Sequence, residues 1–529
     1  MEGVILSVRE LVIAPQLGEV ALVDRVSFDV LPASVCALVG ESGSGKTLTS
    51  RAVMGLLPEN LAVKSGALGF CGEDLLDFGP AELRRVCGAR IGMVFQEPMS
   101  SLNPALTVGT QVTEALCWHR HMSPGDARTA AVAMLDAFRV PNAATSLDRY
   151  PHEFSGGLRQ RIMLAAVMLL RPKLLIADEP TTALDAIVQK DVLDDMVRVA
   201  KDMNAGVLFV THDLGLVERY ADQLVVLRRG KMEEAGPTGE LLRSPASAYT
   251  RSLLAAAPSK RAPRRSTGTG QVLLAIDRLC VDYTASGGFF GARAKSFRAV
   301  DQLSFDVRRG EFVGLVGESG SGKSTTGRAI AGLVDVAGGQ IIFDGTNVAG
   351  TEGPARHQAR NRIQYVFQDP YSSLNPRQTI GAIVSAGLAE LPRAARRAKV
   401  EQLLVDVGLE AAFADRLPHQ LSGGQRQRVC IARALAVDPD LLIADEAVAA
   451  LDVTVQAQVL DLLAALQRRR GFACLFISHD LAVVRSICDR VAIMKNGKLE
   501  AFDETGRVFG ASGNPYVKKL VSAFPTLSQ

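Results

Sequence analysis

The stretch GESGSGKT, residues 40–47, decides the fold of this chain. It directly follows an apolar run, residues 36–39, and it matches the pattern G-x-x-x-x-G-K-[ST]. Glycines in this pattern let backbone N–H groups close around phosphate oxygens, and the next helix points its positive N-terminus at them. The stretch therefore predicts a strand, a phosphate-binding loop and a helix.

The pattern occurs a second time, as GESGSGKS in residues 317–324. Four more motifs are repeated in the same order, namely VFQ, SGG, LLIADE and HDL. Five motifs repeated in one order indicate two copies of one domain. A stretch rich in Pro, Gly, Ser and Arg separates the copies. We therefore expect a first domain at 1–257, a flexible basic linker at 258–270 and a second domain at 271–529.

Within each copy, apolar runs alternate with helical patterns. The runs that precede the loop, the acids and the histidine are continuously apolar, as in parallel strands covered on both faces. Ligand-binding residues of such sheets lie at the carboxyl ends of the strands. The sequence thus predicts an α/β fold with its polar motifs along one edge of a mostly parallel sheet.

The composition sets limits on the function. The chain has 529 residues, 47% of them hydrophobic, and its net charge of +3 is too weak to indicate a nucleic-acid partner. The start of the chain lacks a secretory signal pattern. The longest apolar run, residues 162–170, is about half of a bilayer span and predicts a buried helix. Eight scattered cysteines show no metal-binding spacing and are expected to be reduced thiols.

The two loops predict two phosphate sites. Lys46 and Lys323 would neutralise the β- and γ-phosphates, and Thr47 and Ser324 would bind Mg²⁺. The predicted phosphate-binding residues are Gly40, Glu41, Ser42, Gly43, Ser44, Gly45, Lys46 and Thr47 in the first copy, and Gly317, Glu318, Ser319, Gly320, Ser321, Gly322, Lys323 and Ser324 in the second.

Each LLIADE motif supplies two neighbouring acids with different predicted roles. Asp178 and Asp445 end a strand, where a carboxylate can hold Mg²⁺ through water. Glu179 and Glu446 reach one residue further, where a water would attack in line with the γ-phosphate.

A histidine and a glutamine complete each predicted catalytic set. His212 and His479 close a strand and can hydrogen-bond the γ-phosphate and hold the attacking water. Gln96 and Gln368 offer neutral donors and acceptors to the metal and the water.

The SGG motif predicts a second anion-binding helix end in each copy. The serine would cap a helix, and the glycines would expose backbone N–H groups. Because each domain already has one such end for its own phosphates, the second would serve the nucleotide of the other domain. The predicted residues are Ser155, Gly156 and Gly157, and Ser422, Gly423, Gly424 and Gln425.

Together the two loops, the glutamines and the SGG, ADE, ALD and HD motifs resemble the nucleotide-binding domains of ABC transporters. The resemblance covers both copies and hence nearly the whole chain. The segments SPASAYTRSLLAAAP and GNPYVKKLVSAFP, and SSLNP after each glutamine, resemble the peptide/nickel import group. Two such domains in one chain are similar to the ATPase subunits of microcin C and oligopeptide importers.

The resemblance implies two tandem P-loop NTPase domains, each with a mostly parallel sheet core, an antiparallel β subdomain and a helical subdomain. It implies ATP and Mg²⁺ as cofactors, with ATP at two composite head-to-tail sites whose closure drives a permease. It also implies nucleotide contacts from Asp185 and Asp452 of the ALD motifs and an aromatic ring, Tyr283, under adenine.

The implied partners are two integral membrane permease subunits and an extracytoplasmic substrate-binding protein, without nucleic acid. The implied location is the cytoplasmic face of the inner membrane, with no transmembrane segment in the chain itself. Segments 104–113 and 376–386 are expected to meet the permease, so cysteines at Val108 and Ile380 are expected to crosslink to it.

Three departures from the family pattern distinguish the copies. The segment around each SGG motif is called the signature below, and the helix that it starts the signature helix. The first signature has Phe154 and Leu158 where the family has Leu and Gln. Pro15 stands at the position that corresponds to Tyr283. The second copy has EAVAALD in place of EPTTALD, which leaves Glu446 and Asp452 intact. We expect both sites to hydrolyse ATP and to differ mainly in affinity.

Three other functions are compatible with parts of the pattern. The chain could be a soluble twin-domain ATPase acting on ribosomes or nucleic acid, although it lacks their charged helical linkers and zinc-binding cysteines. A regulatory module without hydrolysis conflicts with the two glutamates, and export is the alternative direction of transport. The cargo stays open among dipeptides, longer peptides, peptide antibiotics, nickel chelates and glutathione.

Overall fold

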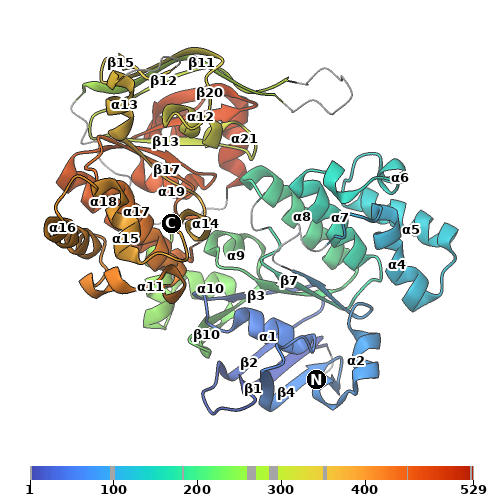
Figure 1. Ribbon diagram of the computed structural model, residues 1–529. Coiled ribbons are helices and arrows are strands. Elements are labelled where there is room, and N and C mark those ends of the chain that lie inside the picture. Colours follow the sequence, from blue (N-terminus) through green and yellow to red (C-terminus); the bar gives the residue numbers. More distant parts are fainter. Residues whose placement is uncertain are drawn as a thin grey trace. The chain divides into compact units, whose positions relative to one another are not determined.

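The computed structural model describes residues 3–95, 102–181, 184–258, 270–284, 296–349, 354–449, 451–524 and 527. Its chain forms two compact units, Met1–Ala257 with Pro525–Gln529, and Pro258–Phe524 (Figure 1). The predicted linker lies outside the described residues, apart from Pro258 and Gly270. Most of the glycine-rich stretch 285–297, which the sequence predicts as a hairpin loop, lies outside them too, since only its last two residues are described.

The first unit contains two sheets. One is antiparallel with strand order β2-β1-β4-β5, and the other is mixed with order β10-β9-β3-β8-β7-β6. In the mixed sheet every neighbouring pair is parallel except β9 and β10. The strands are β1 Leu6–Pro15, β2 Val23–Val30, β3 Val35–Val39, β4 Leu61–Phe70, β5 Glu73–Asp74, β6 Ile91–Val94, β7 Leu174–Asp178, β8 Gly206–Val210, β9 Gln223–Arg228 and β10 Lys231–Pro237.

Helices of the first unit follow the strands or gather in a separate layer. In Figure 1, α4, α5 and α7 (cyan) lie on one side of β3 and β7, and the antiparallel sheet (blue) lies on the other. The helices are α1 Lys46–Val53, α2 Pro80–Val86, α4 Val108–Arg120, α5 Pro124–Ala137, α6 Ala143–Ser146, α7 Gly156–Met168, α8 Ala186–Asp202, α9 Leu214–Tyr220, α10 Thr238–Arg243 and α11 Ala248–Ala256.

The second unit repeats this plan. Its sheets have the orders β12-β11-β14-β15 and β16-β17-β18-β13-β19-β20. The strands are β11 Val272–Thr284, β12 Ser296–Arg308, β13 Phe312–Gly317, β14 Gly338–Phe343, β15 Thr346–Asn347, β16 Ile363–Val366, β17 Leu441–Asp445, β18 Ala473–Ile477, β19 Arg490–Lys495 and β20 Lys498–Glu504. The helices are α12 Lys323–Ile330, α13 Pro354–Asn361, α14 Pro370–Ser373, α15 Ile380–Val384, α16 Arg393–Asp406, α17 Gly423–Leu435, α18 Val453–Arg470, α19 Leu481–Ile487, α20 Thr505–Ala511 and α21 Pro515–Ala523.

The central strands are buried on both faces, as their continuous apolar sequences predict. In β7, Leu174 and Ile176 pack into the cluster shared with the antiparallel sheet. Leu175 and Ala177 pack into the cluster shared with α4, α5 and α7. Successive side chains of a strand point to opposite faces, so one short strand supports both layers. The apolar run at 162–170 lies largely within the buried helix α7.

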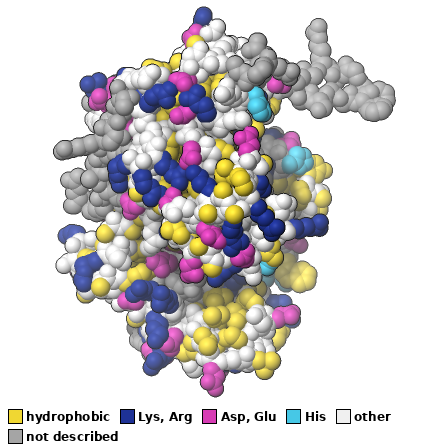
Figure 2. Space-filling view, turned by 60° about the vertical axis from the view of Figure 1, so that its left-hand side comes forward, with side chains coloured by type: hydrophobic (Ala, Val, Ile, Leu, Met, Phe, Trp, Pro, Cys, Tyr) yellow, Lys and Arg dark blue, Asp and Glu magenta, His cyan; other side chains and the backbone are white. Residues whose placement is uncertain are grey.

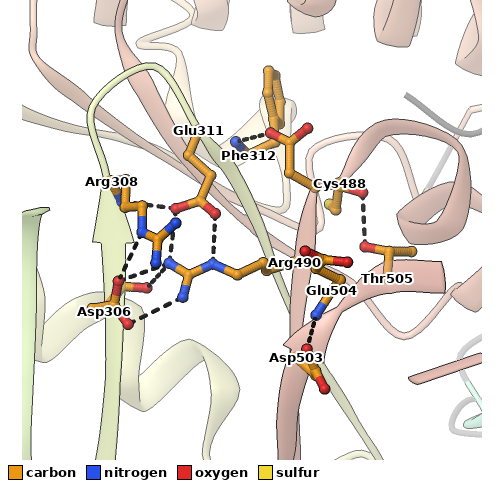
Figure 3. Close-up of polar contacts among 10 residues, drawn as sticks. Asp306, Arg308, Glu311, Phe312, Cys488, Arg490, Asp503, Glu504 and Thr505 are labelled. Carbon is orange, nitrogen blue, oxygen red and sulfur yellow. Dashed lines mark hydrogen bonds and ion pairs between the residues drawn. The ribbon is translucent and has the colours of Figure 1, made fainter. Parts of the chain in front are cut away.

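Arg490 ties the two sheets of the second unit together (Figure 3). It lies on β19 and donates to Asp306 of β12 at 2.8 Å and 3.1 Å. It also donates to Glu311, which is 3% exposed, at 2.6 Å and 2.9 Å. The first unit has Gln223 and Ser34 at the positions of Arg490 and Glu311. This ionic link between the sheets therefore belongs to the second unit only.

The surface charges and the helix lengths bear on the predictions about nucleic acid and membrane spans. Figure 2 shows a face on which Lys and Arg side chains are interspersed with Asp and Glu. Among the described residues, no helix is both long enough and apolar enough to cross a bilayer. Their cysteines form no disulfide.

Candidate active sites at the sheet edges

The lysine of each phosphate-binding loop is held by the loop itself. Lys46 Nζ donates to the carbonyl oxygens of Gly40 and Glu41 at 2.8 Å. Lys323 Nζ does the same with Gly317 and Glu318, at 2.9 Å and 2.7 Å. The ammonium group therefore lies inside the loop, where a phosphate oxygen can exchange with a carbonyl.

Tight backbone packing explains the first glycine of each loop. A Cβ on Gly40 would meet the carbonyl oxygen of Leu227 at 2.1 Å, and one on Gly317 would meet that of Met494 at 2.2 Å. The loops run from the ends of β3 and β13 to α1 and α12, which begin at the lysines. They contain the other predicted phosphate-binding residues, Glu41, Ser42, Gly43, Ser44 and Gly45, and Glu318, Ser319, Gly320, Ser321 and Gly322.

A hydroxyl and a carboxylate face each other next to each lysine. Thr47 Oγ1 donates to Asp178 Oδ1 at 3.4 Å, and Ser324 Oγ donates to Asp445 Oδ1 at 3.0 Å. Burial, reinforced by the charge of Glu179, raises the pKa of Asp178 to about 6. Burial also raises the pKa of Asp445. Each pair offers the hard oxygen ligands that Mg²⁺ binds.

The glutamate after each aspartate meets the strand-end histidine. His212 Nδ1 and Glu179 Oε1 are 3.0 Å apart, as are His479 Nδ1 and Glu446 Oε1. Both glutamates have a φ of 47°, in the left-handed region that is uncommon for this residue type. At the glutamate the chain therefore turns away from the direction of the preceding strand. Such backbone conformations are common at functional sites.

Interactions within these pairs shift the pKa values of the histidines and of Glu446 in opposite directions. Burial lowers the pKa of His212, but the hydrogen bond and charge of Glu179 outweigh it and raise that pKa above its usual value. The pKa of His479 is raised by Glu446 in the same way. Burial raises the pKa of Glu446, but His479, Lys323 and Gln368 together outweigh it and leave the pKa lowered. Glu446 is thus ionised at neutral pH, as a group that orients water must be.

Of the two predicted glutamines, only Gln368 of the second unit lies within the described residues. Gln368 Nε2 donates to Glu446 Oε2 at 2.5 Å. Gln96 lies outside the described residues. The second unit therefore brings Gln368, Glu446 and His479 together around one carboxylate.

The signature helices begin differently. Ser422 Oγ accepts from the N–H of Gln425 at 3.4 Å, and Gln425 Oε1 accepts from the N–H of Ser422 at 3.0 Å, which forms a capping box. Ser155 lies at the same helix position, but its side chain makes no capping hydrogen bond. Ser155 is the N-cap residue of α7, but the side-chain cap predicted for it is absent. Leu158 also lacks the side-chain acceptor that Gln425 provides, so no capping box forms. Gly156, Gly157, Gly423 and Gly424 form the first turns of α7 and α17.

Strand register places Pro15 and Tyr283 at equivalent positions. Ile13 pairs with Val23 in the first unit, and Val281 pairs with Val300 in the second. Tyr283 follows two residues after Val281, as Pro15 does after Ile13, and it is 41% exposed. The first unit thus has no ring at this position of its strand.

The aspartates of the ALD motifs cap helices. Asp185 Oδ1 accepts from the N–H of Val188 at 3.0 Å, and Asp452 Oδ1 accepts from that of Val455 at 3.0 Å. Each carboxylate thus starts the helix that follows the acidic strand, α8 or α18.

One contact of the phosphate loop was missed by the sequence analysis. The N–H of Glu41 donates to the hydroxyl of Tyr249 on α11 at 3.3 Å, and Arg228 lies over the Tyr249 ring at 4.7 Å. The second unit has Tyr516 on α21 with Lys495 over its ring at 4.5 Å. The repeated tyrosine in the two C-terminal segments was the signal that could have revealed this support.

Strand order explains why these groups meet. The strands β3, β8 and β7 are neighbours, and so are β13, β18 and β17. Their carboxyl ends carry the lysine loop, the histidine and the acid pair, respectively. Such an edge can bind a polyphosphate, hold a hard cation and activate a water beside the terminal phosphate.

Comparison with known proteins defines the class. The family model described as "ABC transporter" matches residues 23–182 and 300–449, and the model "Oligopeptide/dipeptide transporter, C-terminal region" matches residues 233–281. The chain belongs to the ABC transporter family, and it is an ATP-hydrolysing subunit that carries two nucleotide-binding domains. The sequence prediction of the fold and of the enzyme class is confirmed.

Particular relatives match the chain over its whole length. It is 42% identical to the glutathione import ATP-binding protein GsiA of Escherichia coli strain K12, over 99% of this chain and 90% of that protein. It is 43% identical to the protein of the same name from Shigella boydii serotype 4, with the same coverage. Among solved structures, the ADP- and phosphate-bound dimer of the cassette MJ0796 is 29% identical, with a TM-score of 0.40, over 44% of this chain and 99% of that one.

Proposed function

We propose that the chain is the energy-coupling ATPase of an importer of peptides or peptide-like compounds. The import proteins among its relatives and the oligopeptide transporter region support this cargo class. The observation that carries hydrolysis at both sites is the acid–histidine pair, Glu179 with His212 and Glu446 with His479, at 3.0 Å in each unit.

The residues of each site divide the work of phosphoryl transfer. Lys46 or Lys323 binds the β- and γ-phosphate oxygens and offsets their charge. Glu179 or Glu446 orients the attacking water. His212 or His479 holds the γ-phosphate through one ring nitrogen while the other contacts the glutamate. Electrostatic stabilisation aimed at the transition state supplies most of the rate in such reactions.

The oxygen donors present fit Mg²⁺ bound together with ATP. Thr47 and Asp178, or Ser324 and Asp445, would hold it, with Gln96 and Gln368 as further candidates. Among the described residues no cluster of three His, Cys, Asp or Glu could hold a metal. Mg²⁺ commonly takes few protein ligands beside substrate phosphates and waters. When bound, Mg²⁺ would offset charge on the phosphate oxygens.

Each ATP would lie between a phosphate loop and the signature helix of the other domain. In this arrangement Ser422, Gly423, Gly424 and Gln425 serve the nucleotide of Lys46. Ser155, Gly156 and Gly157 serve that of Lys323. The support is that each signature helix starts with an exposed serine and glycine N–H groups. A helix start of this kind favours an anion.

Single-site variants of the full chain test this exchange. In a Lys323→Ala background only the first loop binds ATP, and Ser422→Arg should then abolish turnover and weaken binding of a fluorescent ATP analogue. Ser155→Arg in the same background is the matched control and should leave analogue binding within about twofold. The reverse pattern would assign each signature helix to its own domain's loop and would rule out composite sites.

Two permease subunits are the proposed membrane partners, together with an extracytoplasmic binding protein. The crosslinking sites expected from the sequence, Val108 and Ile380, are wrong because both side chains are fully buried. Leu106 and Gln378 lie just before these residues and are exposed. Cysteines there, in a Cys71→Ser background, should crosslink to two integral membrane proteins of the inner membrane. Capture of ribosomal proteins instead would favour the ribosome-acting alternative.

A further inference from the structure

A tyrosine hydroxyl supports the acid pair of the second unit alone. Tyr365 lies on β16, next to the strand β17 that ends in Asp445. Its hydroxyl donates to Asp445 Oδ2 at 2.5 Å. Ser324 donates to the other oxygen, Oδ1, at 3.0 Å. Both oxygens of this carboxylate are therefore fixed by hydroxyl groups from two different elements.

The first unit has a methionine at the equivalent position. Met93 pairs with Ile176 in β6–β7, as Tyr365 pairs with Ile443 in β16–β17. A thioether cannot donate a hydrogen bond. Among the hydrogen bonds of the described residues, Asp178 has only the longer contact with Thr47, at 3.4 Å. The two carboxylates thus differ in how firmly they are held.

A second difference between the units makes room for the tyrosine ring. A Cβ on Gly327, within α12, would lie 3.3 Å from Tyr365 Cε2 and 2.7 Å from Ile477 Cδ1. The equivalent residue of α1 is Ser50, which is fully buried. Glycine within a helix is unfavourable, and its presence here is explained by the space that Ile477 needs first and the Tyr365 ring second. Gly327 thus lies beside Ile477 and Tyr365, and the equivalent residues of the first unit are Ser50, Val210 and Met93.

Phe367 packs against the Tyr365 ring. Its ring centroid lies 4.7 Å from that of Tyr365, at an interplanar angle of 45°. Tyr365 itself is 9% exposed. The ring is thus held by packing, and its hydroxyl has one orientation in which to meet Asp445.

We propose that Tyr365 is a positioning residue for Asp445 and gives the second site a higher affinity for its divalent cation than the first. The proposal rests on the proposed role of Asp445 in holding that cation. A carboxylate already fixed in orientation loses less freedom when it binds a metal. Removal of such a supporting hydrogen bond commonly weakens metal affinity by about 10- to 100-fold.

The first test uses Mn²⁺ with ATP as the probe, on the full chain. In a Lys46→Ala background, which leaves the second site, Tyr365→Phe should raise the dissociation constant of Mn²⁺, measured by electron paramagnetic resonance, about 10-fold. The melting temperature and the affinity for metal-free ATP should stay unchanged. An Mn²⁺ affinity within twofold of the parent would overturn the proposal.

Asp445→Asn separates this inference from the function on which it rests. If it removes the Mn²⁺ signal while Tyr365→Phe has no effect, only the role of Tyr365 fails. If Asp445→Asn also leaves Mn²⁺ binding unchanged, Asp445 does not hold the cation, and the proposed metal site fails with it.

The reciprocal exchange tests a gain instead of a loss. In a Lys323→Ala background, Met93→Tyr combined with Ser50→Gly should lower the dissociation constant of Mn²⁺ at the first site several-fold. Ser50→Gly alone is the control and should leave it unchanged. A double variant that folds with an unchanged Mn²⁺ affinity would count against the proposal even if Tyr365→Phe proved unstable.

Discussion

In the first unit β1 ends in Pro15 and the signature helix starts without a side-chain cap, whereas the second unit has Tyr283 and a complete capping box. The catalytic pairs do not differ in this way, because Glu179 and Glu446 meet their histidines at the same distance. The comparison shows that the duplicated site has kept its reacting groups and varied the residues around them. Differences between the sites should therefore concern binding and stability more than chemistry.

The largest effect should come from the residues that the units share. Glu179→Gln and Glu446→Gln should each lower turnover at their own site on the order of 100- to 1000-fold, as when a transition-state contact is removed. Single-turnover hydrolysis in Lys323→Ala and Lys46→Ala backgrounds, respectively, measures each site alone. Undiminished turnover in either variant would mark that site as non-catalytic and end the equivalence of the two pairs.

The ionic link of the second unit should have the next largest effect. Arg490→Gln introduces the residue of the first unit and leaves Glu311 buried without its cation. Breaking a buried pair in this way typically costs about 3 kcal/mol of the free energy of unfolding. Denaturant unfolding of the full chain should show a loss in one of two transitions. Lys498→Gln, which breaks the exposed pair with Asp301, is the control and should cost less than about 1 kcal/mol.

Nucleotide affinity should depend on whether an aromatic ring is present at the position of Pro15 and Tyr283. Stacking of a base on an aromatic side chain contributes roughly 1–3 kcal/mol, which corresponds to about a 5- to 150-fold change in affinity. Pro15→Tyr should tighten ATP at the site of Lys46, and Tyr283→Ala should loosen it at the site of Lys323. Titration with a fluorescent ATP analogue in the single-site backgrounds measures both, with Pro15→Ala as the control. If the two sites bind the analogue equally and neither exchange alters the affinity, the ring does not cause a difference in nucleotide binding between the units.

The smallest effect should come from the helix cap. Leu158→Gln can complete a capping box with Ser155 and should raise the free energy of unfolding by about 0.5–1 kcal/mol. ATP at the site of Lys323 should then tighten up to about fivefold. Leu158→Met, which restores no acceptor, serves as the control. If both variants behave alike, packing rather than capping accounts for the altered signature.

The sequence predicted the features that depend on short contiguous motifs. The loop lysines, the strand-end acids and the histidines lie where the patterns place them, because parallel strands bring their carboxyl ends to one edge. The equivalence of Pro15 and Tyr283 also agrees with the strand register. Such features need only local sequence and the regular geometry of a sheet.

Features that depend on neighbouring strands could not be predicted. The contact of Tyr365 with Asp445 joins residues from two elements far apart in the chain, and so does that of Arg490 with Asp306. The burial of Val108 and Ile380 was missed for a local reason. Thr107 and Thr379 cap the helices that begin at these residues, and the capped first turn directs the apolar side chain into the core.

The link through Arg490 also bears on how each unit opens. Hydrogen exchange detects regions that open separately from the rest of a domain. Since β12 is joined to β19 by buried charges, its amides should exchange mainly when the mixed sheet opens as well. The antiparallel sheet of the first unit lacks that link, so the amides of β2 should exchange faster than those of β12. The duplicated domain would then contain one unit that opens as a whole and one whose outer sheet opens first.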